Sequence, residues 1–134
     1  MDQPLGFEVS LNQPYEQAID TVIAALKTQG FGVLTRIDVR ATLKEKLGVD
    51  MRPYIILGAC NPPLAHQALE TDPLIGLLLP CNVTVEAAPA GGSLVRLTDP
   101  GAMVNFSEKA DQMQDLAATG HAKMAAVAAA LQGL

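Results

Sequence analysis

The two cysteines of this 134-residue chain each precede an asparagine: Cys60-Asn61 lies just before two prolines, and Cys81-Asn82 follows one. Thiols bind soft metal ions and act as nucleophiles, and an asparagine amide can bind a ligand or cap a helix. Unpaired cysteine is also among the most buried residue types and often behaves as a small hydrophobic residue. The repeated dipeptide therefore marks either one chemical site or two similar positions of the core, and the sequence leaves both interpretations open.

A permanent metal site is not indicated by these residues. Structural zinc needs four nitrogen or sulfur ligands, whereas the chain has two cysteines and two well-separated histidines, His66 and His121. We therefore expect no resident metal and no cofactor. Redox chemistry also has little support, because neither cysteine belongs to a Cys-x-x-Cys motif, although a helix beginning after Cys60 would favour a thiolate there.

Other catalytic motifs are missing from the sequence. It contains no Gly-x-Ser-x-Gly, phosphate loop or dinucleotide fingerprint. Asp99 and Glu108 lie near the last predicted loop, and no histidine lies at a spacing that indicates a catalytic pair with either of them. An ordinary hydrolase is not indicated, and whether the chain is an enzyme stays open.

Composition excludes several classes of partner. The formal charge is −5 and the nine basic residues are scattered, which argues against a nucleic-acid partner. No apolar run approaches the roughly 18 residues that a membrane span needs, so we expect no membrane partner. The first residues resemble no secretion signal, which predicts a cytoplasmic protein with reduced, unbridged thiols.

Hydrophobic periodicity and turn residues predict the elements that position the cysteines. Strands are expected at residues 6–11, 31–40, 52–60, 80–88 and 93–99, and helices at 15–29, 41–48, 62–70 and, capped by Ser107, along the alanine-rich C-terminal stretch. Asn61 is placed to cap the third helix, and the Pro-Ala-Gly-Gly turn makes the last two strands antiparallel neighbours.

This order, β-α-β-α-β-α-β-β-α, predicts an α+β fold over residues 1–134 as a single domain. We expect a two-layer α/β sandwich in which a mixed five-stranded sheet carries its helices on one face. The strand at 52–60 is apolar on both faces and is expected in the middle of the sheet. If it lies antiparallel to the strand that begins near Cys81, the two Cys-Asn dipeptides meet at one end of the sheet.

Several blocks of the sequence resemble a known family. They are "GFGVLTRID", "RPYIILGACNP", "DPLIGLLLPCNVTV" and "DPGAM", and the chain resembles in them the bacterial and archaeal family called domain of unknown function 302. The resemblance implies a compact α+β domain that tends to form dimers, and it supplies no activity. The motif residues that carry over are Asp38, Cys60, Asn61, Pro62, Pro80, Cys81 and Asn82.

Three hypotheses follow for function. The leading one is a cytoplasmic homodimer that binds a small-molecule ligand or, transiently, a soft metal ion. Its candidate binding residues are Cys60, Asn61, Cys81, Asn82 and Asp38. The alternatives are a thiol-dependent enzyme or sulfur-handling protein that uses Cys60 or Cys81, and a purely structural or interaction module with buried cysteines. A homodimer is expected because the last helix and the "LIGLLLP" run together carry more apolar surface than one short sheet covers.

Overall fold

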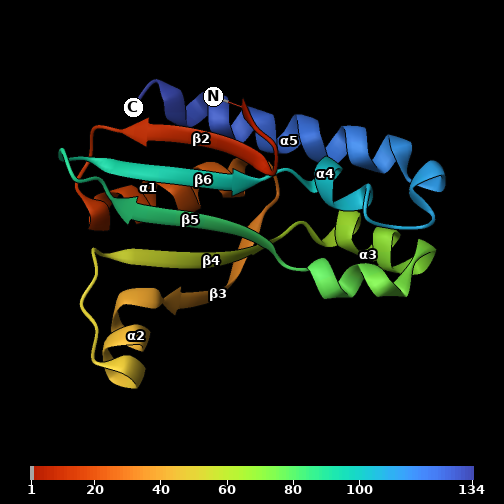
Figure 1. The fold of residues 1–134 in the computed structure, drawn as a ribbon. Helices are drawn as coiled ribbons and strands as arrows, with labels where there is room; N and C mark the ends of the chain where they lie inside the picture. The colour runs from red at the N-terminus through yellow and green to blue at the C-terminus, as the bar shows by residue number, and fades with distance from the viewer. Residues whose placement is uncertain (1) are drawn as a thin grey trace.

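The computed structural model describes residues 2–134 and places six strands in one antiparallel sheet, in the order β1-β2-β6-β5-β4-β3 (Figure 1). The strands are β1 (Asp2–Gln3), β2 (Gly6–Leu11), β3 (Gly32–Asp38), β4 (Tyr54–Cys60), β5 (Cys81–Ala87) and β6 (Ser93–Thr98). The helices are α1 (Tyr15–Thr28), α2 (Val39–Leu47), α3 (Pro62–Thr71), α4 (Pro100–Val104) and α5 (Gln114–Gln132), with the 3₁₀ turns η1 (Pro73–Leu78) and η2 (Ala110–Gln112).

The α+β class and the two-layer arrangement are confirmed. Helices α1 and α5 cover one face of the sheet, and their apolar stripes form the main core with the inward residues of the strands (Figure 1). The fully buried side chains of this core include Val22, Leu26, Leu57, Val83, Val85, Val95, Met124, Val127 and Leu131. The opposite face carries polar residues, among them Glu86, which pairs with Arg52 and Arg96.

Strand directions differ from the mixed sheet that we expected. Every described strand pair is antiparallel, because β2, β5 and β3 run in one direction and β6 and β4, which lie between them, run in the other. The two-residue strand β1 adds a sixth member at one edge. Strand β4 lies next to the edge strand β3 and not in the middle of the sheet.

A second, smaller core lies beyond one end of the sheet. Ala68 of α3, Ile75 of η1, Val104 of α4 and Met113 form a separate buried cluster. In Figure 1 this part of the chain projects past the end of β4 and the start of β5, while α2 lies at the opposite end of the sheet. The cluster therefore supports the region where the two cysteines lie.

The last helix starts later than expected. It begins at Gln114 and not after Ser107, whose hydroxyl instead donates a hydrogen bond to Asp72 at 2.5 Å. The residues before Gln114 form α4 and η2. None of the helices among residues 2–134 is long and apolar enough to cross a membrane.

Candidate functional site

The register of β4 and β5 brings the two Cys-Asn dipeptides together. Ala59 lies opposite Cys81, and Gly58 lies opposite Asn82, so the end of β4 and the start of β5 share one end of the sheet. The predicted antiparallel pairing is confirmed. Its cause is the connection of α3 and η1, which turns back past the end of the sheet and enters β5 beside the residue where β4 stopped.

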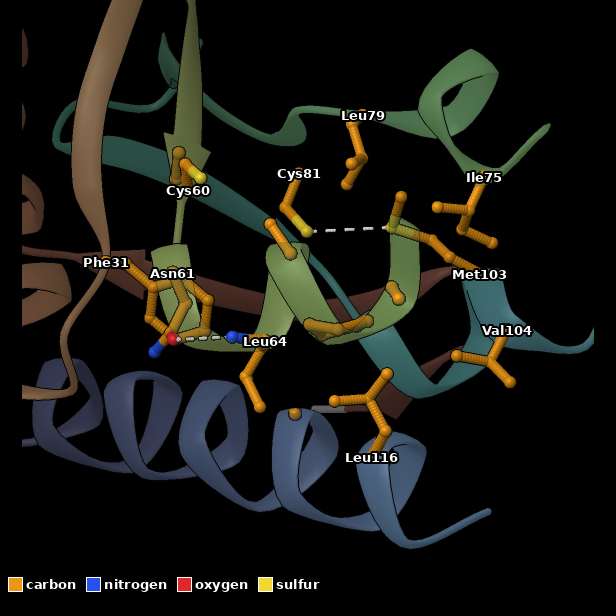
Figure 2. A pocket seen from close by; sticks show the side chains of 15 residues that line it. Phe31, Cys60, Asn61, Leu64, Ile75, Leu79, Cys81, Met103, Val104 and Leu116 are labelled. Carbon is orange, nitrogen blue, oxygen red and sulfur yellow. Dashed lines mark hydrogen bonds between the residues drawn. The ribbon is translucent and has the colours of Figure 1, made fainter. Parts of the chain in front are cut away.

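A cavity of about 50 Å³ lies at this end, between the sheet, α3, η1, α4 and α5 (Figure 2). Three sulfur-bearing side chains line it: Cys60, Cys81 and Met103. Asn61 contributes an amide, and the remaining lining side chains are apolar, as the residues labelled in Figure 2 illustrate. The cavity is thus a small apolar space in which sulfur is the main chemistry.

Cys81 is the buried thiol of the site. It is 7 % exposed, and its Sγ donates to the Sδ of Met103 at 3.6 Å. Burial raises the pKa of this thiol from 9.0 to about 11, with smaller contributions in the same direction from Cys60 and Asp99. Because the protonated thiol dominates at neutral pH, Cys81 is a poor nucleophile.

Cys60 ends β4 and is partly exposed, and neither thiol is bridged. The helix that follows does not offer it free amide groups. Positions 62 and 63 are prolines and have no N–H, and the N–H groups of Leu64 and Ala65 already donate to the side chain and the carbonyl of Asn61. The free N–H groups on which that expectation from the sequence rested are therefore not present at this helix start.

Asn61 has a structural role, in which both the oxygen and the nitrogen of its side-chain amide form hydrogen bonds. Its Oδ1 accepts from Leu64 as the cap of α3, and its Nδ2 donates to the carbonyl of Gln29 at 3.1 Å. The side chain is 8 % exposed. It ties the end of α1 to the start of α3 and so fixes one wall of the cavity.

The other two predicted site residues lie elsewhere. Asn82 is exposed and lines a groove on the uncovered face of the sheet, and its carbonyl accepts from the Thr98 hydroxyl. Asp38 caps α2 at the opposite end of β3 from Gly32, the residue that pairs with Cys60. The structure therefore gathers Cys60, Asn61 and Cys81 at one cavity and separates Asn82 and Asp38 from it.

Sequence reasoning missed Met103, which lies 22 residues from Cys81 with no spacing that signals their contact. It also missed the partner of Asp99. The Nδ1 of His121 lies 2.8 Å from a carboxylate oxygen of Asp99, whose other oxygen caps α4 by accepting from Gly101. This pair joins α4 to α5 beside Met103.

Histidines do not complete a metal site with the thiols. His66 pairs with Glu70 on the exposed surface of α3. Within residues 2–134 there is no group of three or more His, Cys, Asp or Glu side chains placed to hold a metal ion. Any metal chemistry at the cavity would rest on the cysteines together with the Met103 thioether.

Comparisons with known proteins agree on the fold. The model of the family described as "Domain of unknown function DUF302" matches residues 7–131. The crystal structure of an uncharacterized conserved protein of this family from Bacillus stearothermophilus is similar to the chain with a TM-score of 0.83 and 28% sequence identity. The alignment covers 95% of this chain and 98% of that one. No curated protein matches the sequence.

Proposed function

The chain belongs to the family described as domain of unknown function DUF302, and on this fold we propose that the cavity beside Cys81 is a transient binding site for a soft monovalent metal ion such as Cu(I). The observation that carries the proposal is the contact between the Cys81 thiol and the Met103 thioether inside a cavity that Cys60 also lines. Thiolate and thioether sulfurs are the protein ligands that select Cu(I).

Cavity size favours an ion over an organic ligand. Pockets for drug-sized molecules enclose about 300–1,000 Å³. The space here is about 50 Å³, which exceeds the room of about 10–15 Å³ that one water needs but leaves too little for a molecule of many atoms. A single ion with its sulfur ligands fits this volume.

The sulfur separation is close to that of two ligands on one ion. At a metal–sulfur distance of about 2.3 Å, as in zinc sites, two sulfurs at a tetrahedral angle lie roughly 3.8 Å apart. Cys81 Sγ and Met103 Sδ are 3.6 Å apart before any ion is bound. A small outward movement of either side chain would admit the ion.

The raised pKa of Cys81 makes such binding transient. A metal-bound thiol must lose its proton, and with a pKa of about 11 this costs about 5 kcal/mol at neutral pH. The binding free energy is weaker by that amount than it would be for a deprotonated thiolate, and the affinity increases about tenfold for each unit by which the pH rises towards the pKa. The site is therefore suited to passing an ion on and not to retaining it.

Competition with a chromogenic Cu(I) chelator under anaerobic conditions tests the proposal. Wild-type protein should take one Cu(I) per chain from the chelator, and Cys81→Ser or Met103→Leu should weaken binding by about tenfold or more. Met113→Leu is the matched control, because Met113 is buried in the neighbouring core and does not line the cavity. Wild-type protein that leaves the chelator fully loaded would refute the proposal.

The rival hypothesis of a thiol-dependent enzyme has less support. The neutral Cys81 thiol is a poor nucleophile, so such an activity would depend on Cys60. Alkylation with iodoacetamide at several pH values separates the two, since a nucleophilic Cys60 would be modified rapidly near neutral pH in the folded protein.

We also propose that the protein works as a homodimer in the cytoplasm. A compartment that keeps thiols reduced maintains the free cysteines that the site requires. Exposed apolar side chains on η1 and after α4, namely Leu74, Leu77 and Phe106, supply a surface for a second copy.

A further inference from the structure

The two thiols differ in access, and we propose that Cys60 is the first acceptor of the ion, which takes Cu(I) from a thiolate-bound carrier by ligand exchange and passes it to Cys81 and Met103. This inference rests on the proposed function. It names the chemistry of the donor, a soluble thiol that carries Cu(I). It also gives the cysteines of the two Cys-Asn dipeptides different roles.

Exposure separates the roles of the two thiols. Cys60 is partly exposed at the end of β4, whereas Cys81 is 7 % exposed and is enclosed by the cavity wall. A Cu(I) ion bound to carrier thiolates is too bulky to enter a space of about 50 Å³ with its ligands. The carrier can therefore meet the protein at Cys60 and not at Cys81.

Proximity allows the second step. Cys60 follows Ala59, which lies directly opposite Cys81 in the sheet, and both cysteines line the same cavity. Figure 2 shows Cys81 between Cys60 on one side and Met103 on the other. The three sulfur-bearing side chains thus line one cavity that extends from the end of β4 to α4.

The exchange is balanced without any change of oxidation state. The Cys60 sulfur forms a bond to Cu(I) as one carrier thiolate leaves, and the proton of the Cys60 thiol goes to that departing thiolate. Cys81 then replaces the second carrier thiolate in the same way, so that a second carrier thiol is released. Met103 joins as a neutral thioether and gives up no proton, and the Cu–S bond to Cys60 breaks as the Cys60 sulfur takes a proton from the solvent.

Kinetics and equilibrium test this division of roles. Cu(I) bound to glutathione is mixed anaerobically with metal-free protein, and the formation of Cu(I)-bound protein is followed by near-ultraviolet absorbance in a stopped-flow instrument. Cys60→Ser should slow the transfer by about tenfold while changing the dissociation constant by less than about threefold. Cys81→Ser should instead raise the dissociation constant by about tenfold or more.

Cys60→Ala is tested in parallel, and circular dichroism establishes that each variant is folded, so that a misfolded serine variant does not decide the result. An unchanged transfer rate in folded Cys60 variants would overturn the inference. An equal loss of affinity in Cys60→Ser and Cys81→Ser would also overturn it, because Cys60 would then be a resident ligand. Failure of the wild type to bind Cu(I) is a separate outcome that refutes the proposed function itself and the inference with it.

Discussion

At the scale of single residues, the two Cys-Asn dipeptides are alike in sequence and different in environment. Cys81 begins a strand inside the sheet and is buried, whereas Cys60 ends a strand and is partly exposed. Asn61 lies on the cavity side as a helix cap, and Asn82 lies on the uncovered face of the sheet. Alternation along each strand and the register between them create this difference, which the dipeptide itself does not reveal.

The Cys81 thiol predicts a specific pH dependence of stability. Its pKa is raised to about 11 in the folded protein from an ordinary value of 9.0, so the folded state holds the proton more tightly than the unfolded state. The corresponding stability is complete below pH 9 and is lost as the pH rises towards 11, by about 3 kcal/mol in total. Urea unfolding of metal-free protein between pH 8 and pH 11 measures it.

Cys81→Ala is the control for this measurement. The variant lowers stability at every pH, because it leaves a small cavity, but the decrease between pH 9 and pH 11 should shrink by about 3 kcal/mol relative to the wild type. An identical pH profile in both proteins would show that Cys81 does not titrate in this way.

Asn61 carries a second prediction at this scale. Asn61→Ala should destabilise the protein by about 1–3 kcal/mol, because it removes the cap of α3 and leaves the carbonyl of Gln29 without its side-chain donor. Asn61→Asp keeps the acceptor for the Leu64 N–H, but it places a buried carboxylate against the carbonyl of Gln29 and should also destabilise the protein at neutral pH. Chemical unfolding measures both variants, and an alanine variant as stable as the wild type would contradict the structural role of Asn61.

At the scale of elements, the short helix α4 is positioned by α5. A Cβ added at Gly120 of α5 would lie 2.9 Å from the Cβ of Pro100, the first residue of α4, which is too close for two carbon atoms. The Asp99–His121 pair joins the same two helices. Because α4 carries Met103, this close approach sets where the thioether lies relative to Cys81.

Gly120→Ala should therefore move α4 away from α5 and weaken Cu(I) binding by about threefold to tenfold. In a double variant with Met103→Leu, the total loss of binding free energy should be smaller than the sum of the two single losses. The chelator competition described above measures it. Gly76→Ala is the matched control, since its added Cβ would make an ordinary contact at 3.6 Å with Leu69 of α3. Additive losses in the Gly120 and Met103 double variant would show that Gly120 does not act through Met103.

The sequence predicted where helices and strands lie along the chain more accurately than which of them lie side by side in the fold. Periodicity located α1, composition located α2, and the two prolines located the start of α3, which Asn61 caps as expected. Strand order was harder, since β4 is apolar on both faces although it lies next to the edge strand β3 and not in the centre of the sheet. Ser107 resembles a helix cap, but its hydroxyl binds Asp72 from a distant part of the chain. Such contacts, like that between Met103 and Cys81, depend on tertiary structure and leave no local pattern.

At the scale of the whole molecule, the two apolar segments that were expected to form a dimer interface differ in exposure. The apolar stripe of α5 is used within the chain, because Met124, Val127 and Leu131 are fully buried against the sheet. In the "LIGLLLP" run Ile75 is buried in the second core, whereas Leu74 and Leu77 are exposed, at 69 % and 84 %. The surface available to a second copy therefore lies on η1 and beside it, where Leu74 and Leu78 share a groove with Phe106.

Light scattering at micromolar concentration tests the dimer that this surface predicts. We expect a mass of twice the 14.1 kDa of one chain. Leu74→Glu combined with Phe106→Glu should shift the protein to single chains, because charges placed in an apolar interface would have to be buried without partners. Leu47→Glu is the control, since Leu47 is exposed to the same extent as Leu74, at 69 %, but lies on α2 at the other end of the sheet. A wild-type mass near 14.1 kDa would contradict the dimer, and a wild-type dimer that persists in the double variant would place its interface on another surface.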